Sequence, residues 1–147
     1  MQIKVTVKKD QLSQINRNIG QIEQIVSKAA TDVEATAKRS ILLRQSKADV
    51  GREVTSGVIR NGKVKRKSRI HYPSRPGYPP NNDTGMLANS LGSRMIAKDT
   101  AEIYASAEYA LGLEIGTSRT KARPFLVPAL EKVRPSFVKA VKNTLGG

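Results

Sequence analysis

The chain has 147 residues, of which 38% are hydrophobic and 11 are glycine, which is typical of one globular domain with a real core. Its 26 Lys and Arg residues outnumber 12 Asp and Glu residues, giving a formal net charge of +14 that predicts an acidic partner: nucleic acid, an anionic membrane surface or an acidic protein face. There is no cysteine, which excludes disulfides, thiolate metal sites and cysteine nucleophiles.

The N-terminal part predicts a strand followed by a long helix. Ile3, Val5 and Val7 alternate with polar residues, the pattern of a strand with one buried face. From Leu12 to Ile41 apolar residues recur at spacings of three and four, the pattern of an amphipathic helix. The spacing also fits a heptad repeat, so this helix packs either on its own sheet or against a partner chain in a coiled coil.

A β-hairpin rich in cations is predicted next. Residues 54–60 lead into Asn61-Gly62, a dipeptide that tolerates positive φ at both turn positions, and residues 63–70 form the return strand. No acid interrupts the cations between Glu53 and Asp83, which are Arg60, Lys63, Lys65, Arg66, Lys67, Arg69 and Arg75. We expect this basic arm, residues 54–75, to contact DNA or an acidic subunit face; a solvated loop, disordered on its own, is the alternative.

Prolines stiffen the chain after the basic arm. Three of them between residues 76 and 80 lack amide donors and hold the backbone extended as a strut. Asp83 or Thr84 is then expected to cap a short helix that begins around Gly85.

The remaining elements are a second hairpin and two helices. Residues 94–106 read as the hairpin, and residues 109–114 as a short helix stopped by Gly116. An apolar stripe from Leu130 to Leu145 predicts a terminal helix, which Pro135 should kink or split. The fold class is therefore α+β: a long N-terminal amphipathic helix packed on a small, mostly antiparallel sheet, with a protruding basic β-hairpin and a C-terminal helix, in a single domain over residues 1–147.

The sequence offers little catalytic chemistry. A histidine metal cluster or a catalytic triad would need His71, the only histidine, which we interpret as a contact residue or an exposed one. The carboxylates Asp83, Glu102, Glu108 and Glu114 are interpreted as a helix cap, for Asp83, and as partners in local ion pairs. No glycine-rich phosphate loop is visible, so no catalytic residue, metal or cofactor is expected.

The sequence also gives no reason to expect a membrane protein. The N-terminus is too short for a signal peptide core, and no run approaches the ~18 apolar residues that cross a bilayer. We expect a soluble product made in the cytoplasm.

Three blocks of residues follow one another between residues 76 and 130. The first holds Pro76, Gly77, Pro79, Pro80, Thr84, Gly85, Leu87 and Ser90. The second holds Tyr109, Ala110, Glu114, Gly116 and Thr117. The third holds Ala122, Arg123, Pro124, Phe125, Leu126, Pro128, Ala129 and Leu130. In this order they resemble the gene-ten-product-like tail-component family of lambdoid and related long-tailed bacteriophages, over a core of residues 72–130.

The resemblance implies a structural virion component at the neck, where the tail is completed and joined to the head. It implies a homo-oligomeric ring of about six or twelve copies, contacting head-connector and tail-terminator or tail-tube proteins, with non-specific contact to packaged DNA and none to a membrane. The basic arm departs from the minimal family pattern, so no role for it carries over. Within the second and third blocks, we expect the Glu114 carboxylate to meet Arg123 and order the segment that leads to Phe125; alternatively, Gly116 only ends a helix and Phe125 only fills the core.

Two other function classes stay open. A basic nucleic-acid-binding accessory protein would grip DNA phosphates through the arm, and its binding would be sensitive to salt. The scarcity of aromatic residues argues against readout of a specific sequence. An enzyme such as a nuclease or lytic factor is opposed by the absence of a clustered acid or histidine motif.

Overall fold

The computed structural model describes residues 1–6, 19–43 and 51–145. In chain order its elements are β1 (Gln2–Thr6), α1 (Ile19–Leu42), β2 (Arg52–Arg60), β3 (Lys63–His71), α2 (Met86–Ser90), β4 (Leu91–Ala97), β5 (Thr100–Ala105), α3 (Ala110–Ile115) and α4 (Leu126–Leu145). The predicted α+β class is confirmed. Val7 and the predicted first turns of the long helix, residues 12–18, lie outside the described residues.

The body of the molecule is a three-stranded antiparallel sheet covered on one face by helices. Its strand order is β1-β5-β4, so the predicted N-terminal strand and second hairpin are both confirmed. The register aligns Ile103 with Ile3 on one side and Ser93 on the other. Since side chains alternate across a strand, the buried residues Ala101 and Ile103 lie on the same face of β5, toward α1.

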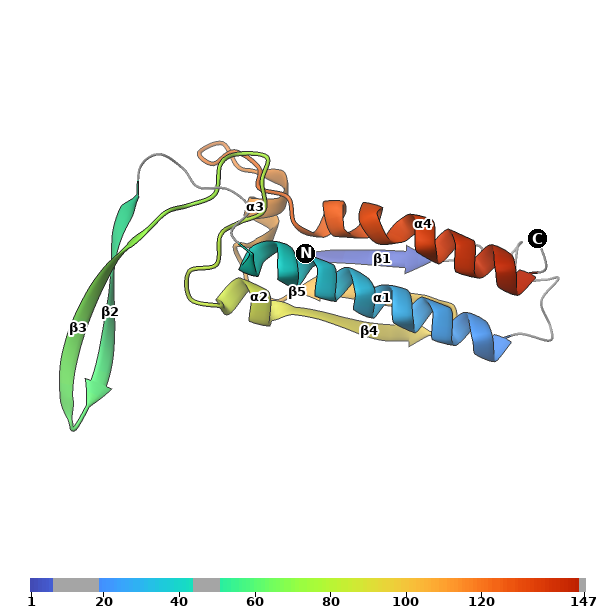
Figure 1. The fold of residues 1–147 in the computed structure, drawn as a ribbon, viewed down its shortest axis with the longest axis horizontal. Helices are drawn as coiled ribbons and strands as arrows, with labels where there is room; N and C mark the ends of the chain where they lie inside the picture. Colours follow the sequence, from blue (N-terminus) through green and yellow to red (C-terminus); the bar gives the residue numbers. More distant parts are fainter. Residues whose placement is uncertain (7–18, 44–50, 146–147) are drawn as a thin grey trace.

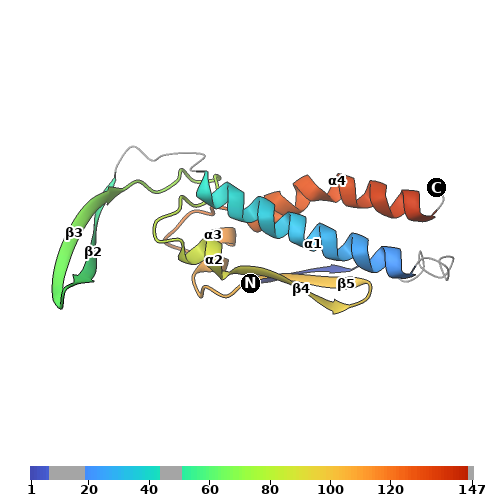
Figure 2. The ribbon, with the colours of Figure 1, turned by 60° about the horizontal axis from the view of Figure 1, so that its bottom comes forward.

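The helix layer consists of α1 and α4, which run antiparallel and side by side (Figures 1 and 2). The buried stripe of α1 is Ile22, Val26, Ala30, Val33, Ala37 and Ile41. Steps of three and four residues keep this stripe on one side of the helix, and the small alanines let neighbouring elements approach closely. The core is completed by Phe125, Leu126 and Ala129, so the prediction that α1 packs on its own sheet is confirmed.

One polar link joins α1 to the sheet. Ser93 on β4 donates its hydroxyl to Glu34 Oε2 at 2.6 Å, and Lys38 Nζ lies 2.6 Å from Glu34 Oε1. Burial acts to raise the pKa of Glu34, but the Lys38 ammonium and the Ser93 hydroxyl outweigh it, so the pKa lies below its ordinary value. Because the folded-state pKa is lowered, the stability that this carboxylate contributes is lost as the pH falls through that pKa.

The opposite face of the sheet carries an ion pair. Arg94 Nη2 lies 2.6 Å from Glu102 Oε2, and the Arg94 guanidinium lies 5.5 Å from the centre of the Tyr104 ring. The ring also covers Gly92, where an added Cβ would come within 2.6 Å of it. Glu102 is buried beneath these groups, so its interpretation as a local ion-pair partner is confirmed.

Helix α4 excludes one of the two outcomes expected at Pro135, a split of the helix. The helix is not split there but continues from Leu126 to Leu145. Pro135 and Glu131 are both exposed, so water can reach the Glu131 carbonyl that proline leaves without an amide donor.

We predict that Pro135→Ala raises the free energy of unfolding by about 1–3 kcal/mol, because it restores a hydrogen bond inside an exposed helix. Pro128→Ala is the matched control, since Pro128 lies in the first turn of α4, where amides have no partner within the helix. Urea denaturation measures both. An unchanged or lower stability for Pro135→Ala would contradict the argument.

Candidate functional site

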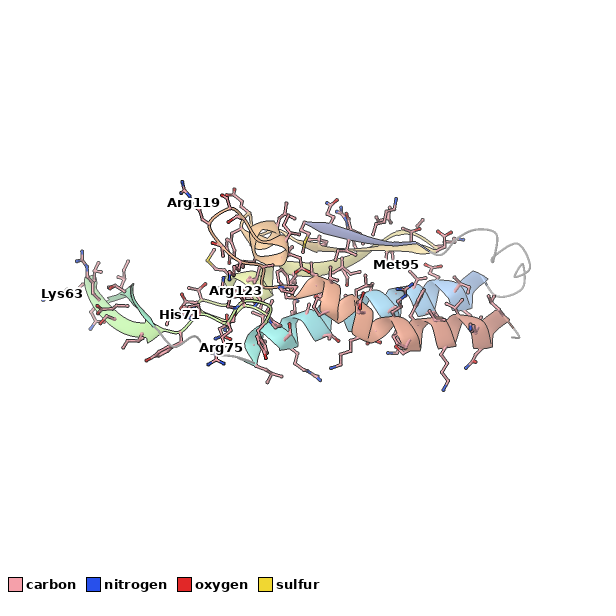
Figure 3. All side chains as sticks on the ribbon, turned by 90° about the horizontal axis from the view of Figure 1, so that it is seen from above. Lys63, His71, Arg75, Met95, Arg119 and Arg123 are labelled. Atoms are coloured by element: carbon pink, nitrogen blue, oxygen red, sulfur yellow. The ribbon has the colours of Figure 1, made fainter. Side chains whose placement is uncertain are left out.

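The basic arm forms a two-stranded ribbon that projects from the body (Figure 1). Strands β2 and β3 are antiparallel, with Arg60 opposite Lys63 at the tip and Arg52 opposite His71 at the base. Asn61 and Gly62 have φ of 52° and 70°, the positive values that the Asn-Gly turn predicts. Figure 3 shows Lys63 at the far end of the ribbon, and His71 and Arg75 near the body.

The register of the ribbon separates its cations. Residues at alternate positions share a face, and the cross-strand pairs extend these two sets to both strands. One face holds Arg60, Lys63, Lys65, Lys67 and Arg69. Arg66 belongs to the opposite face, paired with Gly57, and Arg75 lies beyond the ribbon in a turn where its carbonyl accepts the Tyr78 amide at 3.2 Å. The seven cations of the arm are thus divided among three places.

The proline strut connects the ribbon to the body. Gly77, whose φ is 82°, donates its amide to the Ala122 carbonyl at 2.9 Å, and Asn82 donates its amide to the Ile41 carbonyl at 3.1 Å. Pro80 is buried, whereas Pro76 is exposed and Pro79 half-buried. The strut is therefore fixed both to the end of α1 and to the segment that precedes α4.

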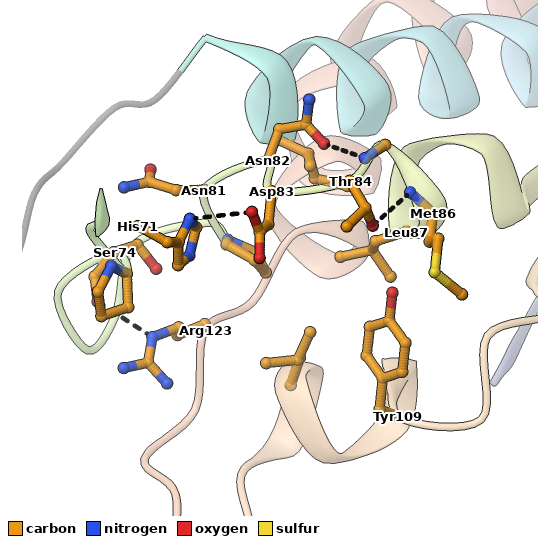
Figure 4. A pocket seen from close by; sticks show the side chains of 15 residues that line it. His71, Ser74, Asn81, Asn82, Asp83, Thr84, Met86, Leu87, Tyr109 and Arg123 are labelled. Atoms are coloured by element: carbon orange, nitrogen blue, oxygen red, sulfur yellow. Dashed lines mark hydrogen bonds and ion pairs between the residues drawn. The ribbon is translucent and has the colours of Figure 1, made fainter. Parts of the chain in front are cut away.

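The turn before α2 bonds to its first amide through Thr84, one of the two residues predicted to cap it. Asn82 Oδ1 accepts the Gly85 amide at 2.8 Å, and Thr84 Oγ1 accepts the Met86 amide at 3.4 Å. Asp83 Oδ1 lies 3.6 Å from His71 Nδ1 (Figure 4). Gly85, with φ of 82°, precedes the helix, which starts at Met86.

The position of His71 corrects an expectation. We expected a contact residue or an exposed one in an arm without nearby acids, but its side chain is only 9% exposed and faces Asp83. His71 ends β3, and Asp83 follows the strut. This pair therefore ties the base of the ribbon to the body.

Glu114 is the most heavily used carboxylate among the described residues. Its Oε2 accepts the amides of Phe125 at 2.8 Å and Leu126 at 3.1 Å, and its Oε1 accepts the amide of Val127 at 2.8 Å. The next residue, Pro128, has no amide hydrogen. The carboxylate thus satisfies the amides at the start of α4, where the helix dipole favours negative charge.

The expected contact between Glu114 and Arg123 is wrong. Arg123 Nε donates to the Ser74 carbonyl at 3.1 Å, and the Arg123 amide donates to the Leu113 carbonyl at 2.6 Å. The carboxylate is taken by the three amides of α4 instead. Arg123 therefore joins α3 to the segment just before the strut, and Pro124, half-buried, leads from it to the fully buried Phe125.

Gly116 does more than end α3. It has φ of 82°, and an added Cβ would lie 2.9 Å from the Ala122 nitrogen and 3.0 Å from the Thr120 carbonyl oxygen. Thr117 closes the same turn, since its hydroxyl accepts the Thr120 amide at 3.0 Å. Only glycine lets the chain fold back this closely, which aligns Glu114 with the start of α4.

A cavity of about 480 Å³ lies beside the base of the ribbon (Figure 4). Ile41, Leu87 and Leu113 line it together with polar residues that include His71, Ser74, Asp83 and Arg123. Ser74, His71 and Asp83 share this space, but the Ser74 side chain is fully buried and its hydroxyl donates to the Tyr78 carbonyl at 3.5 Å. The cavity is therefore better suited to binding a chemical group than to presenting Ser74 as a nucleophile.

A scan against protein-family models and searches of curated proteins and of solved structures match nothing to this chain. Across residues 1–6, 19–43 and 51–145, neither long helix has the length and apolar character to cross a membrane. The same residues gather no group of three His, Cys, Asp or Glu side chains able to hold a metal ion. Two features remain for an argument about function: the ribbon, and the junction at its base where the segments around Ser74, Glu114 and Phe125 meet.

We predict that Glu114→Gln lowers the free energy of unfolding by about 1–3 kcal/mol, because an amide offers one acceptor oxygen where the carboxylate offers two. Glu108→Gln makes the same charge change at an exposed site and should stay within about 0.5 kcal/mol of the parent chain. Denaturant titration compares the two. Equal effects would show that the cap contributes nothing.

Proposed function

We propose that this chain is a structural virion component of a tailed bacteriophage, which forms a homo-oligomeric ring at the neck, completes the tail and joins it to the head connector. The three motif blocks support the family likeness. The observation that carries the proposal is their placement: residues far apart in sequence meet in one junction, from Ser74 and Gly77 through Glu114 and Ala122 to Phe125, at the base of a projecting ribbon.

The residues of this junction hold backbone segments together, which supports a structural role over an enzymatic one. Glu114 is buried and occupied by backbone amides, and Arg123 by a backbone carbonyl. Gly116 is required by a close backbone approach. A catalytic site would need such groups open to a substrate, whereas a ring subunit needs a rigid support for a protruding contact element.

The rim of the cavity supports a contact with a neighbouring subunit. Met86 and Tyr109 line the cavity and are 61% and 47% exposed. A ring is built from heterologous contacts, in which a protrusion of one copy meets a hollow of the next. The ribbon and the cavity, which His71 at the end of β3 helps to line, offer surfaces of these two kinds.

A nucleic-acid-binding accessory protein is the second candidate, favoured by the cations that share one face of the ribbon. It predicts a monomer that binds random duplex DNA with a steep salt dependence. The first candidate predicts a ring. The mass of the purified chain in solution separates the two.

We predict that removing the outer ribbon abolishes joining and spares the fold. Replacing residues 56–67 with Asn-Gly connects Thr55 to Ser68, which face each other across the ribbon, so the body keeps its core. The melting temperature should be unchanged. Electron micrographs of assemblies made with the shortened chain should show separate heads and tails. Infectious particles from the shortened chain would contradict the role of the arm, and a chain that stays monomeric at high concentration and is missing from finished virions would contradict the proposal itself.

A further inference from the structure

All the cations of β2 and β3 except Arg66 lie on one face of the ribbon by register. On β3 they stand at every second residue from Lys63 to Arg69, which places them about 6.7 Å apart along the strand, given a rise of ~3.3–3.4 Å per residue. The partners of Lys65, Lys67 and Arg69 on β2 are Val58, Ser56 and Val54. None of these partners is an acid.

The opposite face of the ribbon has a different character. It carries Ile59 and Val64, a cross-strand pair 75% and 64% exposed, and Arg66 opposite Gly57. The only acid of the two strands, Glu53, belongs to this face as well. Positive charge without a compensating acid is therefore confined to the first face.

This pattern favours a uniform polyanion over a protein surface. The centres of protein interfaces are depleted of lysine and depend on apolar or aromatic anchors. Three of the six cations on this face are lysines, the six being Arg52 at the base and Arg60, Lys63, Lys65, Lys67 and Arg69. Duplex DNA carries one phosphate on each strand per ~3.4 Å of helix axis, so the cation spacing of about 6.7 Å corresponds to about two base-pair steps measured along the axis. The major groove also admits a two-stranded β-ribbon.

We propose that the face of the ribbon formed by Arg60, Lys63, Lys65, Lys67 and Arg69 binds duplex DNA along its backbone without reading its sequence. The proposal deepens the neck function by naming the partner of the arm, and it rests on that function for the source of the DNA. A duplex is favoured over a single strand because neither strand of the ribbon contains Phe, Tyr or Trp on which unpaired bases would stack, and the one imidazole, His71, is buried against Asp83 at the base.

The consecutive residues Lys65, Arg66 and Lys67 give a matched test, because each change to glutamine removes one positive charge from the same strand. Five phosphate contacts predict a slope of about −4.5 for log binding constant against log salt, and so a loss of about 500-fold in affinity between 50 and 200 mM salt. Lys65→Gln and Lys67→Gln should each reduce that loss to about 150-fold. Arg66→Gln, on the opposite face, should keep the loss near 500-fold.

The measurement is fluorescence anisotropy of the full chain with a random-sequence 30-mer duplex as probe, over this salt range, with melting curves to verify that each variant folds. Equal slopes for the three variants would overturn the proposal, because net charge rather than one face would then govern binding. Absence of duplex binding by the parent chain at 50 mM salt would overturn it too. Tighter binding to single-stranded DNA of the same length would contradict the choice of a duplex.

These outcomes are separate from those of the neck proposal. A ring that is present in virions but binds no duplex would refute the DNA contact alone. Face-dependent binding by a chain missing from virions would refute the neck function alone.

Discussion

The structure depends most on one buried carboxylate. Glu114 lies in the last turn of the short helix α3, and its two oxygens accept three amides at the start of α4. An ionised group is costly to bury unless it is hydrogen-bonded, and here the helix terminus supplies both donors and a favourable dipole. The carboxylate fixes where α4 begins, and so where Phe125 and Leu126 enter the core.

That position then determines where the arm is held. The segment before α4 bonds to α3 through the Leu113 carbonyl and to the strut through Ser74 and Gly77. The strut continues from β3, whose last residue, His71, faces Asp83. The ribbon therefore extends from a base fixed at several points, which is the condition for a protruding element to reach a partner in a defined direction.

The elements could be predicted from the sequence and the contacts of the junction could not. Alternation and the Asn-Gly dipeptide located both hairpins, and three-four spacing located both long helices, because these patterns are local. The split that the sequence allowed at Pro135 does not occur, since an exposed helix face lets water satisfy the freed carbonyl. We expected Glu114 to contact Arg123, but the sequence cannot reveal that three amides at the start of α4 bond to the carboxylate instead. The pairing of His71 with Asp83 joins residues on two segments, and no periodicity encodes it.

The claim that Glu114 couples α4 to the strut is tested most directly by amide hydrogen exchange, comparing the parent chain with Glu114→Gln. The account predicts that the Leu126 and Val127 amides lose protection, and that the Gly77 amide, bonded to the Ala122 carbonyl, loses it with them, while the Ile103 amide in the central strand stays protected. Retained protection at Gly77 alongside loss at Leu126 would contradict it, because the strut would then be held independently of the carboxylate.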